Sequence, residues 1–180
     1  MKLWLIILII WVTVALIILI KRGQQTTDSG NNADNSKLLN PCYIHLRPGS
    51  VTPKLDDKTP FAAVVAISSE VSNDWRNEVS DWLVESGCRY MLAWGLDCSL
   101  WDDSVDLANL EKYEYMSVPD DKSVMTTWHE NESLDSVFWF AKTSAVHGSF
   151  ELTRLIILDI CAETREETII ERYEHAACES

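Results

Sequence analysis

The sequence predicts an α/β fold, a three-layer sandwich in which helices cover both faces of a mostly parallel central sheet of four or five strands, preceded by one transmembrane helix. Three observations support it: an apolar segment near the N-terminus, a polar segment after it, and then strand-length apolar runs that alternate with helical stripes. We therefore expect a membrane anchor over residues 1–22, a flexible tether over 23–40 and an α/β domain over 41–180.

The anchor is indicated by residues 3–20, an apolar run that only Thr13 interrupts. As a helix this run would span roughly 27 Å, about the thickness of one hydrocarbon core. It is longer than the apolar part of a usual signal peptide, and no A-x-A-like cleavage site follows it. Lys21 and Arg22 instead resemble a stop-transfer flank. We expect an uncleaved, single-pass anchor that contacts the lipid bilayer through residues 3–20.

The charges around the anchor favour, by a small margin, a cytoplasmic location for the domain, because Lys21 and Arg22 outnumber Lys2. The five cysteines are scattered without a CxxC pair, which agrees with a reducing compartment. A domain facing the periplasm is the alternative. Residues 23–40 are rich in Gln, Asn, Ser, Thr and Gly, and a coil of this length reaches about 25 Å, so the domain would stay near the bilayer.

Two strand-then-helix units follow the tether. The first begins with residues 61–68 (FAAVVAIS), a continuous apolar run typical of a strand covered on both faces, and its helical stripe stops at Gly87. The second begins with a strand over residues 88–94 (CRYMLAW), and its short helix is marked by Leu107 and Leu110.

Two further units complete the domain. Residues 122–129 (KSVMTTWH) predict a third strand, and the apolar stripe over 134–145 predicts the helix after it. Residues 152–160 (LTRLIILDI) predict a fourth strand, and the capping-box pattern over 164–167 predicts the start of a last helix. Residues 42–46 add a candidate edge strand.

Parallel strands bring their carboxyl ends to one edge of the sheet, where ligands bind in open α/β folds. The sharpest group expected there is Asp97 and Cys98 with His129 and Glu130: Cys98 would be a nucleophile that His129 activates, and a carboxylate would orient the imidazole. The alternative is structural, with a partly buried cysteine and a histidine at the end of a strand. We name Cys98, His129 and Asp97 as the candidate catalytic residues.

The acidic turn between the second strand and its helix supplies three of the four candidate binding residues, and Glu130 follows the third strand. Its carboxylates, together with His129, could also hold a divalent cation, although acidic residues before a helix more often act as caps and dipole partners. Neither a zinc spacing nor an EF-hand pattern is present, so we assign no metal site and no cofactor. The candidate binding residues are Trp101, Asp102, Asp103 and Glu130.

The charge of the chain narrows the class of partner. A formal net charge of -13 without a Lys/Arg stripe excludes nucleic acid as an expected partner and suits a basic protein partner better. No GxGxxG, GxxxxGK[ST] or G-x-S-x-G pattern is present, so the sequence carries no nucleotide fingerprint and no hydrolase elbow.

Three segments carry a family resemblance: residues 91–106 (MLAWGLDCSLWDDSVD), 124–130 (VMTTWHE) and 138–142 (FWFAK). They resemble a small uncharacterised bacterial α/β family, a domain of unknown function about the size of residues 55–165. The resemblance implies a bacterial source, and with it an inner membrane for the anchor and a domain compatible with the cytoplasm. It transfers no catalytic residues.

Two functional hypotheses follow from these observations. The first is a tethered interaction or regulatory module whose acidic, tryptophan-bearing edge binds a protein at the bacterial inner membrane. The second is a hydrolase or transferase that uses Cys98 and His129 with a carboxylate or a bound divalent cation. The first is favoured, because no matched set of nucleophile, base and oxyanion donors can be identified.

Overall fold

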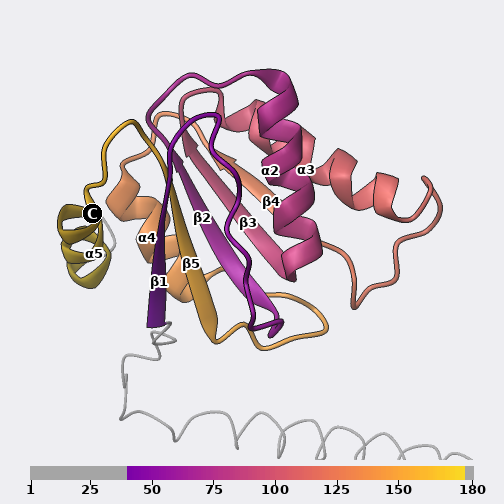
Figure 1. Cartoon of the computed structure of the whole chain (residues 1–180). Helices are drawn as coiled ribbons and strands as arrows, with labels where there is room; N and C mark the ends of the chain where they lie inside the picture. The colour runs from indigo at the N-terminus through magenta and orange to yellow at the C-terminus, as the bar shows by residue number, and fades with distance from the viewer. Residues whose placement is uncertain (1–39, 177–180) are drawn as a thin grey trace, which may run out of the picture. The chain divides into compact units, whose positions relative to one another are not determined.

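The computed structural model describes residues 40–176. This part of the chain forms five strands and four helices that alternate from the second strand onward (Figure 1). In chain order the elements are β1 (Asn40–Leu46), β2 (Phe61–Ile67), α2 (Asn73–Ser86), β3 (Cys88–Gly95), α3 (Cys98–Lys112), β4 (Met125–His129), α4 (Leu134–Thr143), β5 (Arg154–Ile160) and α5 (Glu166–His175).

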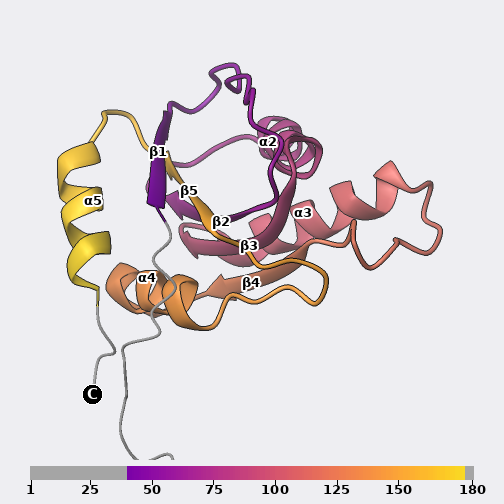
Figure 2. The same ribbon diagram turned by 90° about the horizontal axis from the view of Figure 1, so that it is seen from below.

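The strands form one sheet in the order β1-β5-β2-β3-β4, and every neighbouring pair is parallel. Helices α2 and α3 cover one face, whereas α4 and α5 cover the other (Figure 2). The prediction of an α/β fold with a parallel sheet is therefore confirmed, with five strands. The candidate edge strand at residues 42–46 is also confirmed, as β1.

The predicted anchor over residues 1–22 lies outside the described residues, as does the predicted tether except for Asn40, where β1 begins. Between residues 40 and 176, none of the helices combines the length and the hydropathy that a bilayer crossing requires.

Strand β2 lies in the middle of the sheet, and all seven of its residues are buried. Its side chains alternate between two apolar layers: Ala63 and Val65 pack on the α2 and α3 side, whereas Ala62 and Val64 pack on the α4 and α5 side. A strand covered on both faces has no position for a polar side chain, which explains the continuous apolar run in the sequence.

Helix α3 differs from the prediction. It spans 15 residues from Cys98, whereas the sequence suggested a short helix marked by Leu107 and Leu110. Both leucines are exposed, at 43% and 42%, because the side of α3 that faces the core carries Trp101 and Val105 instead. The apolar residues on the solvent side of the helix misled the periodicity argument.

Three element boundaries also differ from the prediction. Strand β4 begins at Met125, since the backbone N–H of Lys122 is used in a turn with the carbonyl of Pro119. Strand β5 begins at Arg154, two residues later than predicted. The predicted capping box at residues 164–167 is wrong: the N-cap of α5 is Arg165, and its side chain does not cap the helix.

Gly95 ends β3 at a position where no other residue fits well. Its φ is +100°, and an added Cβ would lie 2.1 Å from the carbonyl oxygen of Ile67 on the neighbouring strand. That carbonyl also accepts a hydrogen bond from Leu96 N–H, so it cannot move away freely. The close approach fixes the direction in which the chain leaves β3 toward α3.

Replacing Gly95 with alanine should destabilise the domain by about 3 kcal/mol or more, because strain at positive φ adds to a backbone clash. Chemical denaturation of the full chain measures the change. Gly148→Ala is the control, since a Cβ there meets nothing within 4 Å and no positive φ is involved. Equal stability of the two variants would contradict the close approach at Gly95.

Candidate functional site

The carboxyl ends of the five parallel strands lie at one edge of the sheet, as the sequence predicted. From β2 the chain proceeds to β3 and β4 on one side, and it returns to place β5 on the other side. The point between β2 and β5 is therefore a topological switch point, the usual location of a ligand site in open α/β sheets. Polar side chains gather in two groups along this edge, one beside the switch point and one at β3 and β4.

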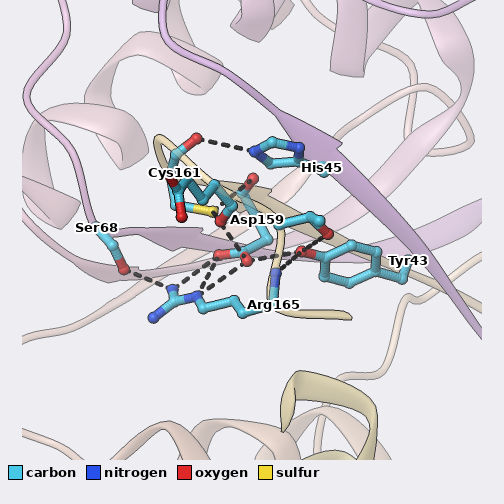
Figure 3. A network of polar contacts seen from close by, with 8 residues as sticks. Tyr43, His45, Ser68, Asp159, Cys161 and Arg165 are labelled. Atoms are coloured by element: carbon cyan, nitrogen blue, oxygen red, sulfur yellow. Dashed lines mark hydrogen bonds and ion pairs between the residues drawn. The ribbon is translucent and has the colours of Figure 1, made fainter. Parts of the chain in front are cut away.

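The group beside the switch point is centred on Asp159, whose side chain is fully buried in β5 (Figure 3). Arg165, the first residue before α5, donates from Nη2 to Oδ1 at 2.8 Å and from Nε to Oδ2 at 3.0 Å. Tyr43 of β1 donates its hydroxyl to Oδ2 at 2.9 Å, and the Cys161 thiol donates to the same oxygen at 3.2 Å. Three elements are thus joined through one carboxylate.

These contacts determine the protonation of the Asp159 carboxyl and the Cys161 thiol. Burial alone would raise the pKa of Asp159, but the hydrogen bonds from Arg165, Cys161 and Tyr43 outweigh it, so the pKa lies below its ordinary value. Burial and the neighbouring carboxylate raise the pKa of the Cys161 thiol to about 11. A thiol that stays protonated at neutral pH is a poor nucleophile.

Two further contacts tie this group to the neighbouring strand ends. Arg165 Nη2 donates to the hydroxyl of Ser68, directly after β2, at 2.6 Å. Nε2 of His45 lies 2.9 Å from the carbonyl oxygen of Cys161. Both carboxylate oxygens of Asp159 accept hydrogen bonds from within the chain. We call this network of Asp159, Arg165, Tyr43, Cys161 and Ser68 the brace, because it holds β1, β2, β5 and the start of α5 together.

The sequence predicted that the strand over residues 152–160 ends at this edge, but it missed Tyr43 and Arg165. The capping-box pattern concealed Arg165, because it assigned Thr164 to the helix start, whereas the Thr164 hydroxyl lies 3.3 Å from the Tyr43 hydroxyl. Nothing in local periodicity connects Tyr43 with a residue more than a hundred positions later.

The second group contains the candidate catalytic residues. Cys98 begins α3 and is buried in the α2 and α3 layer, where it contacts the backbone of His129. Burial, with a smaller contribution from the charge of Glu130, raises the pKa of the Cys98 thiol. Asp97 is exposed in a left-handed conformation and makes no side-chain cap to the helix.

The His129 imidazole lies on the other side of the sheet. Its Nε2 is 3.1 Å from the Thr127 hydroxyl, its Nδ1 is 3.1 Å from a carboxylate oxygen of Glu132, and its ring meets Phe140 of α4 edge-on. Both ring nitrogens therefore have partners other than the Cys98 thiol. The catalytic roles of Cys98, His129 and Asp97 stay predictions, and this geometry supplies the thiol with no base.

The candidate binding residues differ in how far they are buried. Trp101 is fully buried and packs edge-on against Trp75, with ring centroids 6.4 Å apart, so it belongs to the core. Asp103 and Glu130 are exposed, whereas Asp102 is 7% exposed. Trp128 of β4 is 54% exposed.

Asp102 and Asp106 form an acid pair beside β4. The Thr126 hydroxyl donates to Oδ1 of Asp106 at 2.9 Å, while Oδ1 of Asp102 is buried without a hydrogen-bond partner. Burial raises the pKa of both carboxyls and the charge of Asp103 adds to the effect, whereas hydrogen bonding with Thr126 lowers each pKa by less. Between residues 40 and 176, no group of three or more His, Cys, Asp or Glu side chains is arranged to hold a metal ion.

Comparison with known proteins gives a family. A family model described as a domain of unknown function, DUF7684, matches residues 41–176. The chain belongs to the DUF7684 family. The match confirms the resemblance to an uncharacterised domain family and extends it beyond residues 55–165 to include β1 and α5. No curated protein and no solved structure matches the chain.

In this DUF7684 domain, Asp159→Asn should lower the free energy of unfolding by about 2 kcal/mol at neutral pH, because Arg165 loses its ionised partner. The depressed pKa means that the stabilisation is present above the ordinary value of 3.8 and is lost as the pH falls through the lower, folded-state pKa. Urea denaturation of both chains across this pH range measures the difference. Asp57→Asn, at an exposed carboxylate, is the control, and an equal loss there would contradict the brace.

Asp102→Asn should have the opposite effect and stabilise the domain by about 1 kcal/mol at neutral pH, because a buried carboxylate oxygen without a partner is replaced by a neutral amide. A raised folded-state pKa means that ionisation costs stability as the pH rises, so the two chains should converge in acid, where the carboxyl is protonated. Thermal unfolding at several pH values measures this. A less stable variant at neutral pH would show that the carboxylate has a stabilising partner; Asp103→Asn is the exposed control.

Proposed function

We propose that this DUF7684 chain is a protein-interaction module tethered to the bacterial inner membrane, with its α/β domain in the cytoplasm. Residues 3–20 would hold the chain in the bilayer, and residues 23–40 would let the domain search the membrane surface. A partner bound by the domain would be kept at the membrane, which is the basis for a regulatory role.

The observation that carries the proposal is the open edge of the sheet at β4, with an exposed apolar side chain on each face. Among the described residues, no strand pairs with the outer side of β4. Trp128 and Met125, both on this strand, are 54% and 48% exposed. Tryptophan and methionine are enriched at protein interfaces, and an open sheet edge offers unpaired backbone groups to a second chain. These features favour a binding surface.

The alternative function, hydrolytic or transfer chemistry through Cys98 and His129, has less support. It needs a thiol with an accessible base, yet the thiol is buried with a raised pKa and the imidazole is engaged by Thr127 and Glu132. Cys98→Ala should therefore leave the cellular role of the protein intact.

Site-specific photocrosslinking in cells tests the proposal. A photoreactive phenylalanine analogue at Met125 of the full chain should crosslink a discrete protein in the membrane fraction, because the side chain lies at the open edge. The same analogue at Val51, which is 92% exposed in the loop after β1, is the control position.

A product that appears at Met125 and not at Val51 would support the interaction module. No product at Met125, or the same products at both positions, would contradict a binding surface at β4. Recovery of the chain from the soluble fraction would contradict the membrane tether.

A further inference from the structure

We infer that β4 receives a basic, extended segment of a separate protein, which pairs with the strand and places a lysine or arginine against Asp102 and Asp106. The inference rests on the proposed function, since it names the chemistry of the partner that the interaction module binds. Figure 2 shows the setting: β4 lies at one end of the sheet, between α3 on one face and α4 on the other.

The charge around β4 is uncompensated. Asp102 and Asp103 are adjacent on α3, and Asp106 lies one turn later. None of the three forms an ion pair with any residue that the structure describes. The charges of Asp103 and Asp106 act on Asp102, and that of Asp103 acts on Asp106, so the three carboxyls form one electrostatic group. Such a group attracts a cation and repels an acidic segment.

Asp102 adds an observation that is independent of charge. Its side chain is 7% exposed, and Oδ1 has no hydrogen-bond partner. Buried polar atoms in folded proteins are nearly always paired, so an orphaned carboxylate oxygen beside an open strand points to a donor that arrives from outside the domain. A lysine or arginine supplies both the donor and the charge.

The alternation of β4 tells which side chains of a bound strand would meet these acids. Thr126 faces α3, because its hydroxyl contacts Asp106, and Trp128, two residues on, lies on the same face. His129 faces α4, because its ring contacts Phe140, so Met125 lies on that face as well. Beside Trp128, a cation also gains from the aromatic ring.

The expected ligand therefore has an alternating pattern. Its side chains on the α3 face would be lysine or arginine, next to the acid pair and Trp128, and those on the α4 face would be apolar, next to Met125. Because β4 has five residues, the recognised core is equally short. Backbone hydrogen bonds supply affinity in strand addition, and the alternating side chains supply specificity.

Charge also favours a basic partner over a second copy of the chain as the segment that pairs with β4. Two copies paired through β4 would place two acid groups near each other, and like charges across an interface oppose association. The short strand β4 and the neighbouring carboxylates of α3 would thus disfavour pairing between two copies, while leaving the edge open to a basic segment.

The test is a binding titration of the full chain in detergent micelles with fluorescently labelled synthetic peptides. The first peptide alternates lysine and valine, the second alternates glutamate and valine, and the third has the lysines and valines of the first in two separate blocks. Fluorescence anisotropy should show binding of the first peptide, with at least tenfold weaker binding of the other two.

Three variants locate the contact. The double variant Asp102→Asn with Asp106→Asn should weaken binding at least tenfold, and Trp128→Ala should weaken it severalfold without affecting the fold, because its side chain is half exposed. Glu78→Gln with Glu171→Gln removes the same number of charges from exposed positions of α2 and α5 and should leave the affinity unchanged. Thermal unfolding of each variant confirms that it is folded.

Equal binding of the alternating and block peptides, no binding of the alternating peptide, or an unchanged affinity in the double variant would each overturn the inference. If crosslinking at Met125 nevertheless captures a discrete protein, the interaction module stands and only the basic strand is wrong. Displacement of a dimer by the peptide in sedimentation experiments would identify a second copy as the natural occupant and would also overturn the inference.

Discussion

The need to cover a parallel sheet on both faces governs this domain. Backbone pairing in β2 and β5 is satisfied on both sides, and their side chains enter two apolar layers, so neither strand can carry exposed polar residues outside its end. Four helices cover the faces, but between residues 40 and 176 no strand pairs with the outer side of β4. In the described residues, polar groups are therefore concentrated at the carboxyl ends of the strands and beside the edge at β4.

The two polar groups at the carboxyl edge behave oppositely. Around Asp159 every acceptor is met by Arg165, Tyr43 or Cys161, and the depressed pKa of Asp159 reflects that satisfaction. Around Asp102 an oxygen is left without a partner and the pKa is raised. A buried polar network in which every group has a hydrogen-bond partner helps to specify a fold. A buried polar group without a partner is typically retained where function requires it. This contrast indicates an architectural role for the first group, and it supports the binding role that we propose for the second.

The sequence predicted most of the architecture because the signals were local. The apolar run of β2 and the stop at Gly87 are readable within a few residues, and parallel connectivity follows from alternating strands and helices. Strand order is not local, so the sequence could not show that β4 is an edge. The predicted binding residue Trp101 is fully buried, whereas Trp128 is exposed, because α3 and β4 place their aromatic residues on different surfaces.

The central claim, that the outer side of β4 is occupied when the protein works, is tested most directly by amide hydrogen exchange. Two samples of the full chain would be compared: one in a mild detergent extract of membranes, and one purified to homogeneity. The account predicts slower exchange across Met125–His129 in the membrane extract, with β1, the other edge of the sheet, unchanged. Equal exchange of β4 in the two samples would contradict it.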